Sequence, residues 1–448
     1  MLKHLFVFAA IFMALIPFRI HAQDNLRWYR TYHHDKLIST QSPDYHANKV
    51  AIEQQYRDFQ YYGSEKNIVI PLVFHFVLPE NVQISAEAIN TQIQSLNDDF
   101  SGFTLKEQSV LDFSGHFYDS ITLAARQELI ARASEDSGIS FCIGVSQQPG
   151  NPALGVEQIT RAGVVWSEDD QVKSLGKGGL DPWNPQQYLN IWVCALPDSI
   201  SGYAQMPGGD WSTDGIVVDY RLFGTKVSNA ANPSAYDKGK TLTHLIGNYL
   251  NLYDLWGHAY RCQDDNVEDT PVHNAPNFGD PFARHISTCD GFPVEMVMNF
   301  MDASDDTGQY MFTRGQVKRM QAVLAENGWR AALGQSSPDV ICSATPLTEN
   351  MIQARNKEQQ ETLKASFEVL IAPNPAADAF NITVVAPEDA QAELKIMNSS
   401  GQLISLRQQR FLKGVSVVPV YCSDWPRGLY FLSVRTENAV LQKRIALE

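Results

Sequence analysis

Residues 244–254, HLIGNYLNLYD, carry polar side chains at the spacing of a metal-binding helix. Side chains at positions i and i+4 share one face of a helix, and His244 and Asn248 have this spacing. Asp254 follows beyond an expected turn at Asn251. A catalytic zinc ion needs three converging ligands, one open position for water and a carboxylate that takes the proton of that water. An imidazole, an amide and a carboxylate stand here at the three ligand positions.

Long-motif zinc endopeptidases carry H-E-x-x-H-x-x-G/N-x-x-H, and this segment departs from that motif at three places. Leu245 stands at the general-base position, and loss of a positioned base costs about 10²–10⁴ in rate. Asn248 replaces the second His, although a neutral amide oxygen is a poor ligand for zinc. Asp254 replaces the third His with a carboxylate, which is a competent ligand. With His244 as the single nitrogen ligand, we do not expect a tight zinc site.

The composition excludes some partners. The chain has 448 residues, which suffices for two or three domains, and its formal net charge is −15. This acidity argues against nucleic acid or an anionic membrane as the main partner.

The N-terminal end has the pattern of an exported protein. Residues 1–22 combine a basic start, an apolar run and the ending Ile20-His21-Ala22, which predicts a secretory signal peptide cut after Ala22. The run is shorter than the ~20 apolar residues that span a bilayer, and no other segment has that character. Residues 23–65 are expected to form a short helical prosegment or N-terminal extension.

Alternating strand and helix patterns predict an α/β domain over residues 66–333. Strand-like runs occur at 68–77, 139–145, 188–194, 202–206 and 215–220, and helical periodicity at 84–100, 238–252 and 314–327. Residues 334–366 are polar without a period and are interpreted as a linker. Short alternating runs between turn residues predict an all-β sandwich over residues 367–448.

Several segments between residues 66 and 330 together resemble the pappalysin family of metzincin zinc endopeptidases, in its bacterial secreted branch. The segments include YLNIWVCALPDSISGYAQMPGG, GKTLTHLIGNYLNLYDLWG, CQDDNVEDTP and MVMNFMDASDD. The resemblance implies an α/β (α+β) domain with a twisted mixed sheet and an active-site helix, and zinc as the cofactor of the family.

The resemblance also assigns residues outside the helix. Residues 299–302 correspond to the Met-turn, where Met301 packs beneath the metal, and Ala303 stands where the family has a Tyr that assists catalysis. The acidic loop places Asp265, Val267 and Thr270 at positions that hold structural calcium in the family. Calcium prefers oxygen ligands, so a calcium site and a solvated acidic turn both remain open.

Six cysteines in an exported chain permit disulfides. Cys262 and Cys289 lie in loop-like sequence around the motif and are the favoured pair. Cys142 and Cys194 lie in strand-like runs, where buried free thiols are an equal alternative.

Four further histidines are candidate metal ligands. Near the motif, His258, His273 and His285 are expected at the surface, with rescue of a metal site as the alternative. His75 lies in an apolar run and is expected to be a core histidine.

Residues 367–448 resemble the type A sorting domain of the type IX secretion system. The matching residues are Ala372–Pro375, Gly401, Gly428–Phe431 and Lys443–Ile445. This resemblance implies the type IX machinery as a partner and export through the periplasm to the cell surface or the medium. A carbohydrate- or protein-binding sandwich is the alternative.

Three functions follow from these patterns. The first is a secreted, inactive pseudoprotease that binds a peptide or protein in its cleft, for example by strand addition at a sheet edge. The second is a zinc metalloendopeptidase with a remodelled site that uses His244, Asp254 and another ligand. The third is a structural or surface-assembly component. The residues at Leu245 and Asn248 favour the first.

Overall fold

The computed structural model describes residues 28–61, 67–107, 120–148, 151–225, 235–257, 262–279, 286–335, 340–343, 345–365, 368–386, 389–412, 414–436 and 440–448. The expected signal peptide, His258 and His285 lie outside these residues. Within them, no helix combines the length and apolar character that a membrane span requires.

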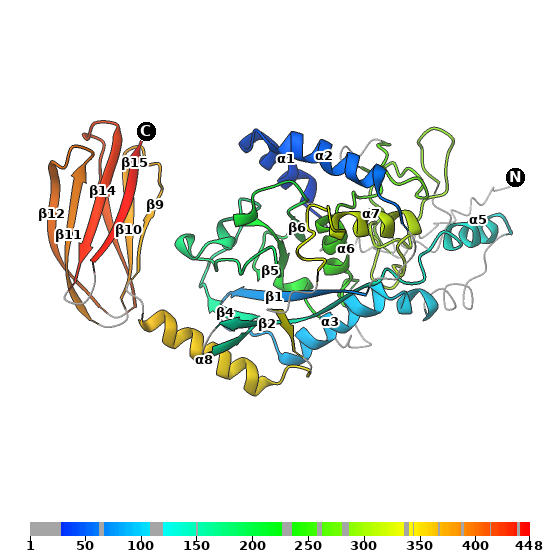
Figure 1. Ribbon diagram of the computed structural model, residues 1–448, viewed down its shortest axis with the longest axis horizontal. Helices are drawn as coiled ribbons and strands as arrows, with labels where there is room; N and C mark the ends of the chain where they lie inside the picture. Colours follow the sequence, from blue (N-terminus) through cyan, green and yellow to red (C-terminus); the bar gives the residue numbers. More distant parts are fainter. Residues whose placement is uncertain are drawn as a thin grey trace, which may run out of the picture.

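A mixed sheet forms the centre of the larger domain (Figure 1). Its path is β3-β2-β1-β5-β7-β6, with β4 paired to β1 and β8 to β2. The strands β1, β2, β4, β5 and β7 pair in parallel, whereas β6 runs antiparallel to β7 and forms an edge. The bounds are Ile68–Leu78 for β1, Ile139–Gln148 for β2, Asn151–Leu154 for β3, Val156–Thr160 for β4, Leu189–Cys194 for β5, Gly202–Ala204 for β6, Ile216–Asp219 for β7 and Val340–Cys342 for β8.

Alternate residues of the strands enter two cores on opposite faces of the sheet. In β5, Ile191 and Val193 belong to the main core, while Trp192 and Cys194 belong to a smaller one. The main core includes residues of α3 (Ala86–Phe100), α6 (Lys240–Tyr249) and α7 (Arg314–Leu324). The smaller core is closed by the segment from Trp166 to Leu180. These placements match the strands and helices that the sequence predicted.

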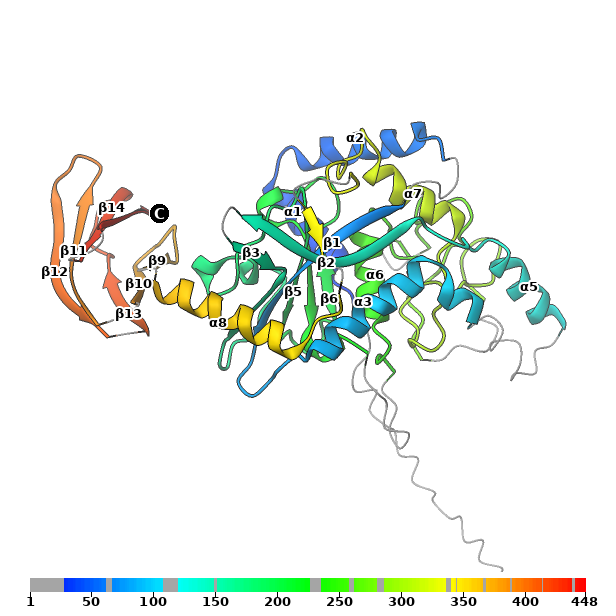
Figure 2. The same cartoon turned by 60° about the horizontal axis from the view of Figure 1, so that its bottom comes forward.

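Two helices near the N-terminus lie together over the edge of the sheet, as both views show (Figure 2). They are α1 (Thr31–Gln41) and α2 (Tyr45–Asp58), and they contact β6 and α7 respectively. A third helix, α5 (Ser120–Ile130), lies near the end of α3. The expected helical extension is therefore packed on the domain.

The region interpreted as a linker has structure of its own. Within it, β8 pairs with β2, and α8 (Glu349–Ala365) packs on the larger domain. Arg355 of α8 forms an ion pair with Glu157 at 3.1 Å, and Gln359 accepts the backbone N–H of Gln158. The sequence suggested a loose connection because α8 is strongly polar, yet specific polar contacts fix the helix.

The C-terminal part is a β-sandwich, as expected. One sheet has the order β13-β10-β9 and the other β12-β11-β14-β15. The strands are β9 (Glu368–Ala372), β10 (Ala379–Ala386), β11 (Ala390–Asn398), β12 (Leu403–Phe411), β13 (Gly414–Tyr421), β14 (Gly428–Arg435) and β15 (Val440–Leu447). Their inward residues form a core separate from that of the larger domain.

Disulfides join Cys262 to Cys289, the favoured pair, and Cys142 to Cys342. The sequence allowed either a bond or a free thiol for Cys142, and its partner Cys342 lies in the region interpreted as a linker. Cys194 and Cys422 are free and buried.

Candidate functional site

The motif helix α6 is fixed in position by a buried ion pair at its first turn. Gly239 precedes the helix at φ 78°, and all ten helical residues are buried. The Lys240 ammonium pairs with Asp99 of α3, and the Thr243 hydroxyl donates to the same carboxylate at 2.6 Å. Burial raises the pKa of Asp99, against the lowering effect of Lys240. Rotation of α6 about its axis would break this contact, so the orientation of His244 is set.

The chain reverses after α6 at the residue that the sequence indicated. Asn251 has φ 77°, the left-handed conformation that Asn and Gly adopt most readily. The Leu252 N–H donates to the Gly247 carbonyl at 2.9 Å, and Arg319 donates through Nε to the Asn251 carbonyl at 2.6 Å. The reversal brings Asp254 back beside His244.

The three expected ligand positions contact one another directly. Oδ1 of Asp254 lies 2.9 Å from His244 Nε2 and accepts from Asn248 Nδ2 at 3.1 Å. Nδ1 of His244 donates to the Phe300 carbonyl at 2.9 Å, and Asn248 Nδ2 also reaches the Leu252 carbonyl. The side chains of His244 and Asn248 are essentially inaccessible, and Asp254 is 8% exposed.

Two residues from the N-terminal part of the chain complete this arrangement. The Tyr29 ring stacks on the His244 imidazole, with ring centroids 3.5 Å apart. The Thr31 hydroxyl donates to Asn248 Oδ1 at 2.8 Å and accepts the Ala204 N–H at 3.2 Å. The sequence reasoning missed both residues, and its one available signal was the aromatic-rich character of residues 28–34.

The residues at the general-base position, in the Met-turn and at the helper-tyrosine position are all buried. Leu245 is fully buried against the edge strand, and a Cβ added to Gly202 of β6 would lie 2.7 Å from its Cδ1. A Cβ added to Gly247 would lie 2.4 Å from the sulfur of Met301, so the methionine packs directly against α6. Ala303 is also fully buried. The framework below the motif is therefore closely packed.

The residues at the motif do not fit a zinc ion. A tetrahedral zinc needs ligand atoms about 2.0–2.2 Å from the metal, directed at one point. His244 Nε2 is bound to Asp254, and Asn248 Oδ1 is bound to Thr31. In the described part of the chain, no three His, Cys, Asp or Glu side chains are grouped as a metal site requires.

The acidic loop does present oxygens suited to a hard cation. Thr270 Oγ1 lies 2.7 Å from Asp265 Oδ1 and 2.8 Å from the Val267 carbonyl. The other carboxylate oxygen of Asp265 is buried without a hydrogen-bond partner, and burial raises the pKa of this residue to about 7. A calcium ion fits this donor set because an unpaired buried carboxylate oxygen faces no competing donor.

His273 was expected at the surface and is instead fully buried. Its Nε2 accepts the Met296 N–H at 2.8 Å, and its Nδ1 lies 3.6 Å from Asp302 beside the Met-turn. His75 is a core histidine that lies 2.9 Å from both Glu157 and Asn190. These contacts place both histidines in structural networks apart from the motif.

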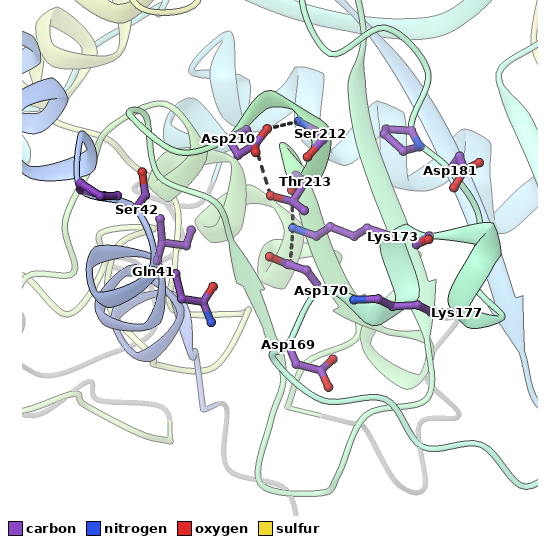
Figure 3. A pocket seen from close by; sticks show the side chains of 14 residues that line it. Gln41, Ser42, Asp169, Asp170, Lys173, Lys177, Asp181, Asp210, Ser212 and Thr213 are labelled. Atoms are coloured by element: carbon purple, nitrogen blue, oxygen red, sulfur yellow. Dashed lines mark hydrogen bonds and ion pairs between the residues drawn. The ribbon is translucent and has the colours of Figure 1, made fainter. Parts of the chain in front are cut away.

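A cavity of about 720 Å³ lies beside α1, away from the motif residues. Figure 3 shows it between the end of α1, the loop around Asp170 and the turn at 210–213. Its charged groups largely bind protein partners: Lys173 donates to the Thr213 carbonyl at 2.7 Å and pairs with Asp170. Asp210 accepts the Ser212 N–H at 2.8 Å. The cavity thus contains no evident catalytic arrangement.

Comparison with known proteins gives the family of this chain. Residues 176–325 match the peptidase model described as Pregnancy-associated plasma protein-A, and residues 370–448 match the model described as Secretion system C-terminal sorting domain. An extracellular metalloprotease of Arthroderma benhamiae is 26% identical over 287 residues, which cover 62% of this chain and 79% of that protein.

Solved structures of metalloproteases are also similar to this chain. A mutant of Tannerella forsythia promirolysin is 30% identical, with a TM-score of 0.57, over 69% of this chain and 97% of that one. Mature mirolysin with a cleaved peptide is 32% identical, with a TM-score of 0.51, over 60% and 96%. The chain belongs to the pappalysin family of metalloproteases and carries a type IX sorting domain, which implies export to the cell surface or the medium.

Proposed function

We propose that this chain is a catalytically inactive pappalysin-family protein whose cleft holds an extended peptide and does not hydrolyse it. The observation that carries the proposal is the direct contact of Asp254 with both His244 and Asn248. These hydrogen bonds occupy the ring nitrogen and the carboxylate oxygen that a zinc ion needs. The absence of a carboxylate at Leu245 removes the base independently.

The edge of the sheet supports the peptide-binding part of the proposal. β6 is an edge strand, and edge strands accept extended peptides through backbone hydrogen bonds. Residues 28–30 already pair with its first residues, since the Arg30 N–H donates to the Gly202 carbonyl and the Ser201 N–H to the Trp28 carbonyl, both at 2.9 Å. An extended backbone therefore fits beside the motif helix.

The test is the zinc content of the purified protein together with peptide cleavage with and without a chelator. We expect no stoichiometric zinc and no chelator-sensitive cleavage. Zinc bound one to one together with cleavage would overturn the proposal and favour the remodelled zinc endopeptidase.

A matched set of restored variants sharpens this test. The pair Asn248→His with Asp254→His should gain metal binding without cleavage, because the base is still absent. Adding Leu245→Glu supplies the base, so any cleavage should appear in this triple variant and not in the pair. Equal cleavage by both variants would contradict the role assigned to position 245.

A further inference from the structure

The described N-terminal segment, residues 28–61, extends the edge of the sheet. Its bridge between Tyr29 and Gly202 is parallel, and two backbone hydrogen bonds of 2.9 Å flank that bridge. Beyond this pairing, the Thr31 hydroxyl accepts the Ala204 N–H. The segment therefore binds backbone groups of β6 that an edge strand otherwise exposes.

The same segment supplies partners for the motif residues. Tyr29 and Thr31 are 4% and 2% exposed, and they cover His244 and Asn248. If the segment left, Asn248 Oδ1 would lose its hydrogen-bond donor and His244 its stacked ring. Departure of the segment would therefore exchange two direct contacts at the motif for contacts with water.

Further along the segment, α2 neutralises a buried cation. Arg319 of α7 is fully buried, and Glu53 of α2 binds its guanidinium through two hydrogen bonds. Arg319 also lies 4.8 Å from the Tyr56 ring. Removing one partner of a buried ion pair is far costlier than removing a surface contact, because the other charge stays buried.

Contacts with the rest of the domain extend along the whole segment. His34 of α1 lies 2.8 Å from Asp170, and Asn48 of α2 donates to the Gly208 carbonyl at 3.0 Å. The cavity beside Asp170 has the end of α1 as one wall, as Figure 3 shows. The segment therefore forms one side of that cavity.

From these contacts we infer that residues 28–61 remain in the mature protein as the permanent occupant of its cleft, where Tyr29 and Thr31 act as positioning residues for His244 and Asn248. This inference rests on the proposed function and names the peptide that the cleft holds. Every hydrogen bond and ion pair that the segment makes to a covered group of the domain must be exchanged for water before the segment can leave. Here Asn248 and Arg319 both depend on the segment.

The test uses the exported chain with a protease recognition sequence in place of residues 62–66. After cutting, we expect the segment to stay with the domain during gel filtration at micromolar concentration. Release of the segment from the domain would overturn the inference. Cutting is applied to the otherwise native chain, so the result does not depend on a variant that fails to fold.

Variants of the cut protein test whether Tyr29 and Thr31 position the motif residues or only hold the segment on the domain. Thr31→Val should speed release at least tenfold, while Ser39→Ala, an exposed hydroxyl on α1, should not. In histidine-labelled protein, the ring-current shift of the His244 proton resonance should persist in Tyr29→Phe and vanish in Tyr29→Leu. An unchanged His244 resonance in Tyr29→Leu would contradict the role of Tyr29.

Native processing gives an independent measurement. The N-terminus of the protein released by a type IX-secreting host should precede Trp28, and an N-terminus beyond Tyr61 would overturn the inference. Zinc is measured on the same samples. If the segment is released and no zinc is found, this inference alone is overturned. If zinc is bound and peptide is cleaved, the proposed function is overturned.

Discussion

The ring of Tyr29 lies flat on the imidazole of His244, with a centroid separation of 3.5 Å and an interplanar angle of 6°. His244 retains the first ligand position of the family motif, and its ring face is covered by a residue 215 positions earlier in the chain. The tyrosine thus covers one face of the imidazole, while the in-plane direction from Nε2, along which a metal would bind, is taken by Asp254 Oδ1 at 2.9 Å.

Replacing Tyr29 with Ala should lower the free energy of unfolding by about 3–5 kcal/mol, the usual cost of deleting a buried aromatic ring. Lys36→Ala, on the exposed side of α1, should change it by less than about 0.5 kcal/mol. Urea unfolding followed by fluorescence measures both. Equal effects from the two variants would mean that the segment is not packed against the domain.

The hydrogen bond between His244 and Asp254 should show coupling in a double-mutant cycle. His244→Ala should cost about 3–5 kcal/mol, because the buried Asp254 carboxylate loses one of its two hydrogen-bond partners. The double variant with Asp254→Ala should cost clearly less than the sum of the single variants. Additive losses would show that the two side chains do not stabilise each other.

Stability should fall as pH rises from about 4 to 7, because of Asp302. Burial raises the pKa of this carboxyl to about 7, while the unfolded chain keeps a value near 3.8. The folded state therefore binds more protons across this interval, so raising the pH removes stability until Asp302 is ionised. At about 1.4 kcal/mol per pH unit, the loss is a few kcal/mol.

Melting temperatures of the native chain and Asp302→Asn, measured between pH 4 and 8, test this. The melting temperature of Asp302→Asn should change less with pH below pH 7, since the asparagine side chain has no proton to lose. Asp290→Asn, which removes an exposed carboxylate, serves as the control. Parallel profiles for native and Asp302→Asn proteins would reject Asp302 as the source.

Calcium should stabilise the protein through the loop at 265–270. A tenfold excess over Kd should add about 1.4 kcal/mol, visible as a higher melting temperature. Asp265→Asn should abolish the shift, and Glu268→Gln, an exposed residue of the same loop, should leave it intact. The absence of a calcium-dependent shift in the native chain would leave the solvated acidic turn as the correct interpretation.

Removing the disulfide between Cys142 and Cys342 should cost roughly 2–5 kcal/mol, because the bridge spans 200 residues and restricts the unfolded chain. The double variant to Ser is compared with Cys422→Ser, which removes a free thiol from the sandwich. A double variant as stable as the native chain would show that β8 contributes little.

Local patterns predicted the elements that carry the motif. The apolar period at 238–252 gave α6, and the Asn251 turn appears with the left-handed conformation that such a position needs. Both are short-range features, set by residue type and by contacts a few positions apart. The Met-turn resemblance likewise placed Met301, which packs against Gly247.

Contacts between residues far apart in the chain could not be predicted from the sequence in the same way. Thr31 and Asn248 are 217 positions apart, and no local pattern links a hydroxyl in one segment to an amide in another. The polarity of 334–366 suggested a linker, because a helix held by ion pairs and amide contacts has no strong apolar stripe. Arg355 and Gln359 fix α8 through polar groups on β4 that only the fold brings near.

The bridge between Cys142 and Cys342 also determines how the protein carries mechanical load. Wherever the sorting domain holds the exported chain at a surface, tension enters the larger domain through α8 and the residues just after β8. The covalent bond passes that tension directly to β2, within the central sheet. The chain between the two cysteines, which includes α6 and the Met-turn, lies inside a closed covalent loop and is bypassed by the pull. His244, Asn248 and Asp254 thus lie off the load path, whereas Tyr29 and Thr31 precede Cys142 and lie outside the loop.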